Sequence, residues 1–315
     1  MNINRFHRLQ TLFGQRLQLD VPLGRYTSAR VGGPADALLE VSTADELAQA
    51  AMALWGESLS WIILGGGSNV LVSDTGVRGV VLLNRARQVD FQEASEPPTV
   101  WAESGANFGL VARQAAGRGL AGLEWAAGIP GTVGGAVVGN AGAHGGDMAG
   151  SLVVAEILQH DPNAQEGMPI RQVWPADRLE YAYRTSLLKR QPRQAVVLAA
   201  TLRLKGSTPE KVQARIDEYV AYRRQTQPPG ASMGSMFKNP PGDYAGRLIE
   251  AAGLKGARVG GAQISTLHAN FFINHGQATA KEIYTLIEMA RQGVAEKFGV
   301  KLELEIELIG EWSDR

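Results

Sequence analysis

The chain of 315 residues contains no cysteine, and this absence removes several kinds of chemistry at once. It excludes disulfide bonds, thiolate zinc sites, cysteine-ligated iron–sulfur clusters and flavins attached through cysteine. The histidines do not have the spacing of metal ligands, since they are scattered as His7, His144, His160, His268 and His275. The sequence therefore predicts neither a disulfide framework nor a metal centre.

An excess of charge is also missing, since 31 basic residues balance 31 acidic ones. No overall field favours nucleic acid or an anionic membrane, although a local basic cluster can still bind a phosphorylated small molecule. No apolar run approaches the ~20 residues that span a bilayer, and residues 1–10 lack the apolar stretch of a signal peptide. We therefore expect a cytoplasmic protein with small-molecule partners. The oligomeric state stays open, and a monomer is compatible with the sequence.

With 44% hydrophobic and 20% charged residues, the composition is that of a globular protein, and the length allows two domains. From residue 36 to about 205, two helices are expected, one after the capping-box pattern at 43–46 and one from about 107 to 117–119. Most of this region reads as short strands bounded by Gly, Asn or Pro, at 37–41, 60–64, 69–73, 79–83, 99–103, 152–158 and 195–204.

The pattern becomes helical after about residue 205. Residues 207–210 (Ser-Thr-Pro-Glu) predict a helix that runs to about residue 225, and we place the domain boundary there. The domains are then 1–206, with an N-terminal extension at 1–20, and 207–315. Further helices are expected at 244–252 and from 279 to Gly299, the latter with one apolar stripe at helical spacing. Residues 301–309 (KLELEIELI) alternate strictly, which predicts a half-buried strand.

The 38 glycines are the unusual feature, and two segments concentrate them. GGGSN at 65–69 follows a predicted strand, and its glycines let backbone N–H groups approach a pyrophosphate. A strand rather than a helix follows, so it is not the dinucleotide fingerprint. GIPGTVGGAVVGNAG at 128–142 has neither helical nor strand periodicity and is more apolar than a disordered linker. The alternative interpretations are a tight β-hairpin turn for the first segment and a structural corner for the second.

These segments, with YTSARVGG at 26–33, resemble the FAD-binding domain shared by vanillyl-alcohol-oxidase-type flavoproteins and UDP-N-acetylenolpyruvoylglucosamine reductases, and are closer to the reductases. The second half resembles the same reductase family at GSMFKNP (234–240), AGRLIEAAGLKG (245–256), GGAQIS (260–265) and HANFFIN (268–274). The resemblance covers nearly the whole chain after about residue 20. It implies an α+β fold, with a two-part PCMH-type (vanillyl-alcohol-oxidase-like) FAD-binding domain plus a smaller α/β substrate-binding C-terminal domain.

The resemblance also gives roles to residues that otherwise have ordinary explanations as surface charges or turn residues. It makes Arg184 the active-site arginine, Ser235 the proton donor and Glu305 the active-site carboxylate. Substrate contacts are expected at or beside Tyr183, Lys238 and Asn239. Non-covalent FAD is expected on the two glycine segments, at Gly65, Gly66, Gly67, Ser68, Asn69, Ile129, Pro130, Gly131, Thr132, Gly134, Gly135, Asn140 and Gly142.

The implied reaction reduces UDP-N-acetyl-3-O-(1-carboxyvinyl)-glucosamine to UDP-N-acetylmuramate, a peptidoglycan precursor. NADPH gives a hydride to FAD, and the hydride then passes to the vinyl carbon of this UDP-sugar substrate. Arg184 can pair with the substrate carboxylate where charge develops, and Glu305 can add a hydrogen bond if its site is dry enough to keep it protonated. Ser235 then delivers the proton.

Two other functions fit parts of the sequence. A sugar or alcohol oxidase on this scaffold often tethers its flavin, but the chain lacks cysteine and the first glycine segment lacks histidine. A non-catalytic nucleotide-binding regulator would not need the three proposed catalytic residues. The chain also departs from the family: Met233 stands where relatives often carry cysteine, and 267–270 vary, so His268 receives no role. No tyrosine-bearing insertion follows Ser186, which resembles the shorter, second type of the reductase.

Overall fold

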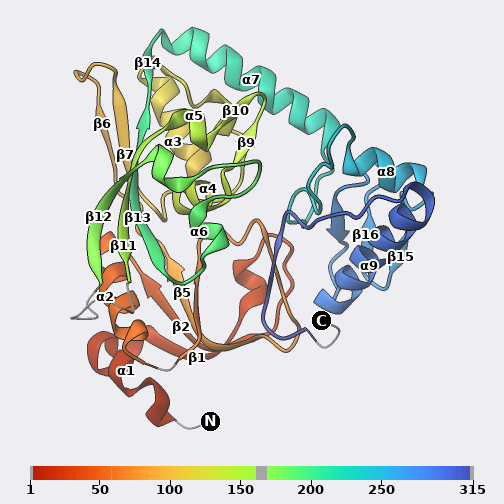
Figure 1. The fold of residues 1–315 in the computed structure, drawn as a ribbon, viewed down its shortest axis with the longest axis horizontal. Coiled ribbons are helices and arrows are strands. Elements are labelled where there is room, and N and C mark those ends of the chain that lie inside the picture. Colours follow the sequence, from red (N-terminus) through yellow and green to blue (C-terminus); the bar gives the residue numbers. More distant parts are fainter. Residues whose placement is uncertain (1–2, 58, 161–168, 313–315) are drawn as a thin grey trace. The chain divides into compact units, whose positions relative to one another are not determined.

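The computed structural model describes residues 3–57, 59–160 and 169–312, and contacts group the chain into two compact units (Figure 1). Unit 1 comprises Met1–Gln18, Ala37–Gly65 and Gly79–Ala221, and unit 2 comprises Leu19–Asp36, Gly66–Arg78 and Tyr222–Arg315. Two segments from the N-terminal half thus group with the C-terminal residues. Contacts therefore divide the chain differently from a single boundary after residue 206.

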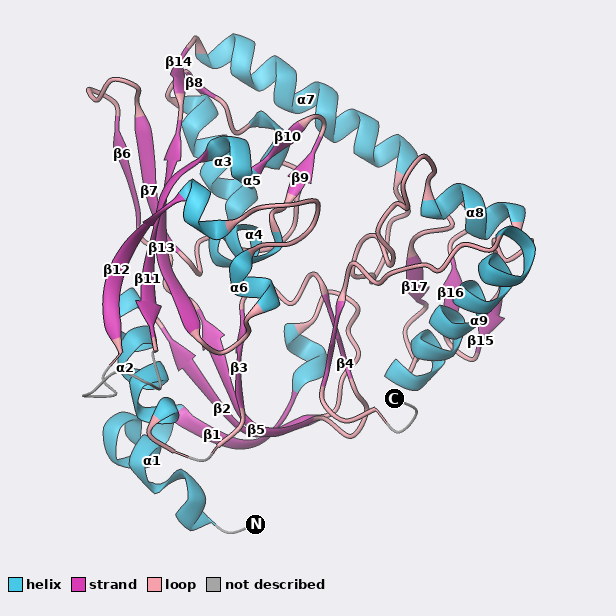
Figure 2. Ribbon diagram, in the orientation of Figure 1, coloured by secondary structure: helices cyan, strands magenta, loops and turns pink. Residues whose placement is uncertain are grey.

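Unit 1 is built on a five-stranded antiparallel sheet with α3 and α4 against one face (Figure 2). The strand order is β12-β11-β13-β7-β6, with bounds β12 Ile170–Pro175, β11 Leu152–Gln159, β13 Ala195–Arg203, β7 Thr99–Glu103 and β6 Val89–Gln92. Residues 196–200 of β13 are all buried, because α2 and α4 both pack against this strand. One core joins sheet residues such as Val100 to Phe108 of α3 and Val137 of α4.

The helices expected in this half begin where their caps predict. Thr43 accepts a hydrogen bond from the Glu46 N–H at the start of α2 (Ala44–Trp55), and Asn107 accepts one from the Leu110 N–H at the start of α3 (Phe108–Gly117). The Glu46 carboxylate bonds the N–H of Ser42 instead of completing a capping box. Both helices are confirmed, as is each strand expected between residues 36 and 205.

A second sheet has the order β1-β2-β5-β3, with bounds β1 Leu17–Pro22, β2 Pro34–Val41, β5 Val77–Asn84 and β3 Trp61–Leu64. The division between the units falls within β1, β2 and β5. The remaining elements of the first 206 residues are short, namely η1 Ile3–Phe6, α1 His7–Phe13, η2 Gly14–Arg16, η3 Leu23–Tyr26, β8 Leu120–Ala121, η4 Glu124–Ala126, β9 Gly142–Ala143, β10 Gly146–Asp147, α5 Met148–Ser151, η5 Ala176–Leu179, α6 Leu187–Arg190 and β14 Lys205–Gly206.

The prediction that residues 128–142 lack helix was wrong for one part. Val133–Gly139 forms α4, which Thr132 caps by accepting a hydrogen bond from the Gly135 N–H and which ends at Asn140 in the left-handed conformation. Glycine at three of its seven positions hides the helical pattern, because glycine contributes no side chain to an apolar stripe. The helices α5 and α6 were also not expected, since four residues are too few to show a period.

Unit 2 packs α8 (Ala245–Ala251) and α9 (Ala280–Phe298) with a three-stranded sheet around one core. This sheet has the order β15-β16-β17, with bounds Arg258–Val259, Ala262–Ile264 and Phe272–Asn274. The helix α9 has the full capping box of Thr279 and Glu282 and ends at Gly299, whose φ is +69°. Its predicted stripe is buried except at Phe298, which is 36% exposed. The expected helix after residue 207 is α7, Pro209–Thr226.

Strand pairing and side-chain hydrogen bonds join segment 66–78 to the C-terminal residues. Its strand β4 (Val70–Val72) pairs in parallel with β18 (Glu307–Ile309). The Asp74 carboxylate accepts hydrogen bonds from the Ala280 and Lys281 N–H groups at the start of α9. The first glycine segment is thus fixed at its C-terminal side to residues more than 200 positions away.

The single strand predicted at 301–309 was wrong, because only Glu307–Ile309 forms a strand. Leu304 instead makes an isolated bridge with Phe237, the chain bends at 305–306, and β18 then pairs with β4. Burial still alternates along the segment, since Leu302 and Ile306 are buried. The change of partner therefore breaks the strand without changing which side chains face the core.

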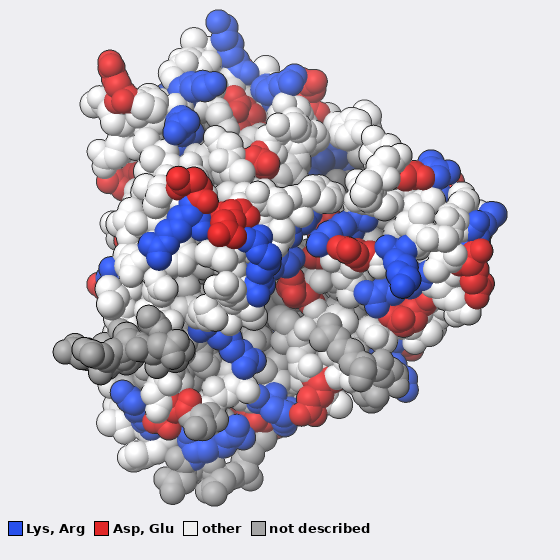
Figure 3. Space-filling model, in the orientation of Figure 1, with Lys and Arg blue, Asp and Glu red and all other residues white. Residues whose placement is uncertain are grey.

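None of the helices in the described residues combines the length and the apolar character that a bilayer crossing needs. On the face shown in Figure 3, blue basic and red acidic side chains are interspersed. This agrees with the balance of charge in the sequence.

Candidate active site

The first glycine segment is not a hairpin turn, because the strands on its two sides pair with different partners. β3 pairs with β5, whereas β4 pairs with β18. Two of its glycines are required by the chain itself. A Cβ at Gly65 would lie 2.5 Å from the Thr132 Oγ1, and a Cβ at Gly67, whose φ is +60°, would lie 2.0 Å from the Tyr26 carbonyl oxygen. The two glycine segments therefore meet at Gly65 and Thr132.

The second glycine segment presents bare backbone along one side of α4. The Gly134 N–H donates to the Ser104 carbonyl at 2.8 Å, and a Cβ at Gly134 would lie 2.8 Å from the Ser104 Cβ, so this glycine serves internal packing. In contrast, a Cβ at Gly135 would make only ordinary contact, and one at Gly139 would meet no atom within 4 Å. Gly135 and Gly139 lie one turn apart on the same side of the helix. This strip can accept a ligand that approaches the backbone closely, which fits a flavin nucleotide.

Asn140 connects the second glycine segment to the segment that carries Arg184. It is 7% exposed and has φ 46° and ψ 58°. Its Oδ1 accepts from the Ala149 N–H at 3.0 Å, and its Nδ2 donates to the Ala182 carbonyl at 3.0 Å. Its amide is therefore used by the chain on both sides, a structural role that the resemblance did not indicate.

Arg184 is the second residue of a two-residue turn. Ala182 and Thr185 exchange backbone hydrogen bonds of 3.1 and 3.2 Å on either side of Tyr183 and Arg184. The φ of Arg184 is +56°, a conformation that is uncommon for residues other than glycine and that persists where surrounding contacts enforce it. Tyr183 is 54% exposed, and the Arg184 guanidinium carbon lies 5.7 Å from the centroid of its ring.

Contacts with α4 and with the residue after it fix this turn at both ends. Asn140 bonds the Ala182 carbonyl at the N-terminal end, as described above. At the C-terminal end, the fully buried Ser186 donates its hydroxyl to the Val138 carbonyl at 2.7 Å and caps α6 by accepting from the Lys189 N–H. A strained arginine held by two anchors is typical of a functional position.

Ser235 and Glu305 lie on adjoining segments of unit 2. The Glu305 N–H donates to the Met236 carbonyl at 3.0 Å, and the Lys238 N–H donates to the Glu303 carbonyl at 2.9 Å. The Asn69 Nδ2 donates to the Glu305 carbonyl at 3.1 Å, and the Asn69 carbonyl accepts from the Glu307 N–H at 2.9 Å. The structure thus brings Ser235, Glu305 and the end of the first glycine segment together, whereas Arg184 belongs to unit 1.

Asn270 is a positioning residue that sequence reasoning missed. It is 2% exposed, and its amide accepts from the Phe237 N–H at 2.9 Å and donates to the Phe237 carbonyl at 2.8 Å. Its own carbonyl accepts from the Met236 N–H. These bonds fix the backbone directly after Ser235. The sequence did contain a sign of this role. An asparagine inside the apolar run HANFFIN is expected to be buried, and a buried amide needs hydrogen-bond partners within the protein.

The other candidates in unit 2 already have partners within the chain. The Lys238 Nζ lies 3.3 Å from the Glu303 Oε2, and the Asn239 Oδ1 accepts from the Ala245 N–H at 3.1 Å at the start of α8. The Nδ1 of His268 accepts from the Asn270 N–H at 3.2 Å, and burial lowers the pKa of this imidazole. No group of His, Asp and Glu within the described ranges could hold a metal ion.

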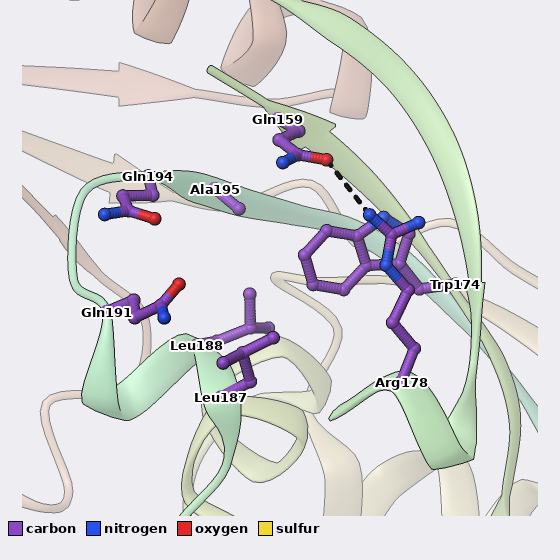
Figure 4. A pocket seen from close by; sticks show the side chains of 8 residues that line it. All are labelled: Gln159, Trp174, Arg178, Leu187, Leu188, Gln191, Gln194 and Ala195. Carbon is purple, nitrogen blue, oxygen red and sulfur yellow. Dashed lines mark hydrogen bonds between the residues drawn. The ribbon is translucent and has the colours of Figure 1, made fainter. Parts of the chain in front are cut away.

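The pocket drawn in Figure 4, about 100 Å³ in volume, is separate from these residues. The Arg178 guanidinium lies over the Trp174 ring, 4.0 Å from its centroid, and its Nη2 donates to the Gln159 Oε1 at 3.3 Å. Its lining consists of Gln159, Trp174, Arg178, Leu187, Leu188, Gln191, Gln194 and Ala195. No candidate site residue is among them, so the pocket is not the predicted active site.

Comparisons with known proteins match both halves of the chain. Residues 35–158 match the family described as FAD binding domain, and residues 225–309 match UDP-N-acetylenolpyruvoylglucosamine reductase, C-terminal domain. The chain is 49% identical over 296 residues to the UDP-N-acetylenolpyruvoylglucosamine reductase of Chloroflexus aggregans, covering 93% of this chain and 97% of the relative. It is 45% identical over 303 residues to that of Rubrobacter xylanophilus, covering 96% and 98%.

A solved structure is similar over the same extent. The crystal structure of UDP-N-acetylenolpyruvylglucosamine reductase from Thermus caldophilus is 38% identical, with a TM-score of 0.77, and the match covers 93% of this chain and 98% of that chain. Together with the two family matches, it confirms the predicted α+β fold of a FAD-binding domain and a distinct C-terminal domain.

Proposed function

Because the chain belongs to the UDP-N-acetylenolpyruvoylglucosamine reductase family, we propose that it reduces UDP-N-acetyl-3-O-(1-carboxyvinyl)-glucosamine to UDP-N-acetylmuramate with FAD and NADPH, in peptidoglycan precursor synthesis. One structural observation supports this most directly. Ser235 and Glu305 lie on segments that are hydrogen-bonded to each other, and the segment of Glu305 also bonds Asn69, at the end of the first glycine segment. The segments of these two residues therefore lie beside a segment proposed to hold the cofactor, which supports the proposed roles of Ser235 and Glu305.

The residues present fit a non-covalent flavin. The backbone at Gly135 and Gly139 is bare, and the chain has no cysteine for a thioether link. The residues proposed to hold FAD are those of the two glycine segments, 65–69 and 128–142. Bound FAD supplies the acceptor and donor of a hydride between NADPH and the substrate.

Arg184 is proposed to stabilise negative charge on the substrate. Its planar guanidinium can form paired hydrogen bonds with the carboxylate of the enolpyruvyl group, next to the carbon that becomes enolate-like. Stabilisation of this kind acts where charge grows in the transition state. The two anchors of the turn hold the arginine backbone in place before the substrate binds, so less ordering is needed during the reaction.

Ser235 is proposed to donate the proton that completes the reduction, and Glu305 to add a hydrogen bond to the enolate-like group. Serine is a weak acid, so its acceptor must be strongly basic, as an enolate-like carbon is. Asn270 fixes the backbone at Phe237, two residues after Ser235. Tyr183, Lys238 and Asn239 are proposed as contacts for the UDP-sugar, with Lys238 exchanging Glu303 for a ligand oxygen.

The division of labour along the chain is also proposed: residues 1–206 bind FAD, and residues 207–315 bind the substrate in a cytoplasmic enzyme without nucleic-acid or membrane partners. Roles in the cell cycle, cell division and cell shape follow from peptidoglycan synthesis.

The variant Ser235→Ala tests the proton-donor role. We expect it to bind FAD and to lose colour with NADPH at close to the wild-type rate, because flavin reduction does not use this proton. Reoxidation by the enolpyruvyl substrate should slow by roughly 100- to 10,000-fold, the usual contribution of general acid catalysis. Stopped-flow absorbance measures the two half-reactions separately.

A matched control is Ser232→Ala, three residues earlier in the same segment. It should leave both half-reactions unchanged. If Ser235 only shapes its turn, its alanine variant should lose about 1 kcal/mol of stability and keep both rates. Equal slowing of the two half-reactions, or of neither, would contradict the assignment.

A further inference from the structure

The two glycine segments proposed to hold FAD contain no charged residue. Neither GGGSN at 65–69 nor GIPGTVGGAVVGNAG at 128–142 includes Lys or Arg. FAD carries two negative charges on its pyrophosphate, and backbone N–H groups contribute only partial positive charge. A dianion in such a site is stabilised further when a guanidinium lies beside it, because hydrogen bonds between ionised groups are the strong ones.

Arg85 lies at the point where the two segments meet. Its Nη1 is 3.4 Å from the Gly65 carbonyl oxygen, and Gly65 is the residue that abuts Thr132 of the second segment. The side chain is half-buried, whereas that of Arg87, two residues later, is exposed. A cation from outside both segments is therefore placed beside the first segment, at the glycine that abuts the second.

Backbone and neighbouring side-chain bonds fix the position of Arg85. Its N–H donates to the Val41 carbonyl at 2.8 Å. The buried Asn84 beside it accepts from the Ala86 N–H and donates to the Ser104 Oγ, while the Ser104 carbonyl accepts from Gly134. Asn84, the residue before Arg85, is thus joined to α4 through Ser104, and this fixes the backbone from which the arginine extends.

The guanidinium of Arg85 is weakly used within the described residues. The bond to Gly65 is long and goes to a neutral oxygen, and no carboxylate of the described ranges forms an ion pair with it. A guanidinium has five N–H donors, so most of its capacity is left for a ligand. An arginine that is half-buried without an anionic partner favours binding of a planar or tetrahedral oxyanion.

We propose that Arg85 binds the pyrophosphate of FAD and is the residue that neutralises its charge. The inference rests on the proposed function, since it takes FAD as the cofactor. It adds a side chain outside both glycine segments to the cofactor site. It also separates two contributions to FAD binding, namely the charge of Arg85 and the close approach that the glycine backbone allows.

The test compares Arg85→Gln with Arg85→Lys in the full chain after removal of FAD, using protein fluorescence to measure the Kd for FAD. Loss of a charge-assisted hydrogen bond should weaken binding by about 10- to 100-fold in Arg85→Gln. Arg85→Lys keeps the charge but loses the fork, so it should fall between Arg85→Gln and wild type at low ionic strength. The difference between Lys and Gln should shrink in high salt, because salt screens the charge.

Arg87→Gln is the matched control and should bind FAD as the wild type does. Thermal unfolding of each protein without FAD reports whether a substitution disturbs the fold. The inference is overturned if Arg85→Gln binds FAD with the wild-type Kd, or if Lys and Gln weaken binding equally at low salt. Absence of FAD binding by the wild type would overturn the proposed function itself, and so separates the two failures.

Discussion

Replacement of Asn140 should weaken both the fold around the second glycine segment and the placement of Arg184. The glycine variant keeps the left-handed backbone of this position but removes the amide that bonds Ala149 and Ala182. Each lost hydrogen bond lowers the free energy of unfolding by about 1 kcal/mol, and by up to about 3 kcal/mol where the partner stays buried and unsatisfied. We therefore expect Asn140→Gly to destabilise the protein by about 2–4 kcal/mol.

The variant Asn140→Ala should be less stable than Asn140→Gly. It loses the same two bonds and must also adopt φ 46° with a Cβ, which costs about 1 kcal/mol more. Asn140→Asp keeps the acceptor for the Ala149 N–H but places a carboxylate oxygen against the Ala182 carbonyl. Thermal unfolding under one set of conditions should therefore rank wild type above Asn140→Gly, and Asn140→Gly above Asn140→Ala.

The same variants should also have a lower turnover. Loss of the bond from Asn140 to Ala182 removes one of the two described anchors of the turn that carries Arg184, so kcat should fall by on the order of 10- to 100-fold in all three variants. Ser186→Ala removes the other anchor and should lower kcat in the same way. Equal melting temperatures for the Gly and Ala variants would refute the backbone argument, and wild-type kcat in every variant would refute the anchoring argument.

Three further outcomes are expected. Arg184→Lys keeps the charge without the planar fork, so kcat should fall by about 100-fold, and near-normal turnover would remove Arg184 from the site. Acid precipitation should release all yellow colour into the supernatant, whereas flavin left in the pellet would indicate a covalent link. The hydrogen bond from Arg16 lowers the pKa of Glu46 from 4.5 to about 2, so this carboxylate stabilises the fold above pH 4.5 and ceases to as pH falls toward 2. As the pH drops from 5 to 2, the unfolding midpoint of Arg16→Met should therefore fall less steeply than that of the wild type. Parallel curves of midpoint against pH would contradict this.

Sequence reasoning succeeded where local chemistry decides the structure. The caps at Thr43, Asn107 and Thr279 marked the starts of α2, α3 and α9, because a side-chain oxygen before a helix satisfies an N–H that the helix cannot. The stripe of α9 was also predictable, since a long helix repeats its apolar spacing several times.

Sequence reasoning failed where the structure of a segment depends on a partner that is distant in the sequence. Alternation at 301–309 correctly predicted which side chains are buried, but not that the backbone changes partner from residues 236–238 to β4. The grouping of 19–36 and 66–78 with the C-terminal residues also depends on distant partners, because β4 pairs with β18 and Asn274 donates to the Ala29 carbonyl. Pairing over such separations leaves no periodic signal in either segment.

The candidate site was predicted in part. The resemblance indicated Ser235 and Glu305, and the structure brings their segments together through bonds to Met236 and Asn69. The anchors Asn270 and Ser186 were not predicted, since their role is to hold backbone that only the folded chain brings near. The left-handed conformation of Arg184 could likewise not be predicted from its residue type, because glycine is the residue expected at positive φ.

The visible spectrum of the purified protein tests the proposed reductase most directly. Without oxygen, addition of NADPH should remove the yellow absorbance of bound FAD. Subsequent addition of UDP-N-acetyl-3-O-(1-carboxyvinyl)-glucosamine should restore it, with formation of one UDP-N-acetylmuramate for each flavin reoxidised. Bleaching by NADPH without recovery on addition of this substrate, or a protein that binds no flavin, would contradict the account.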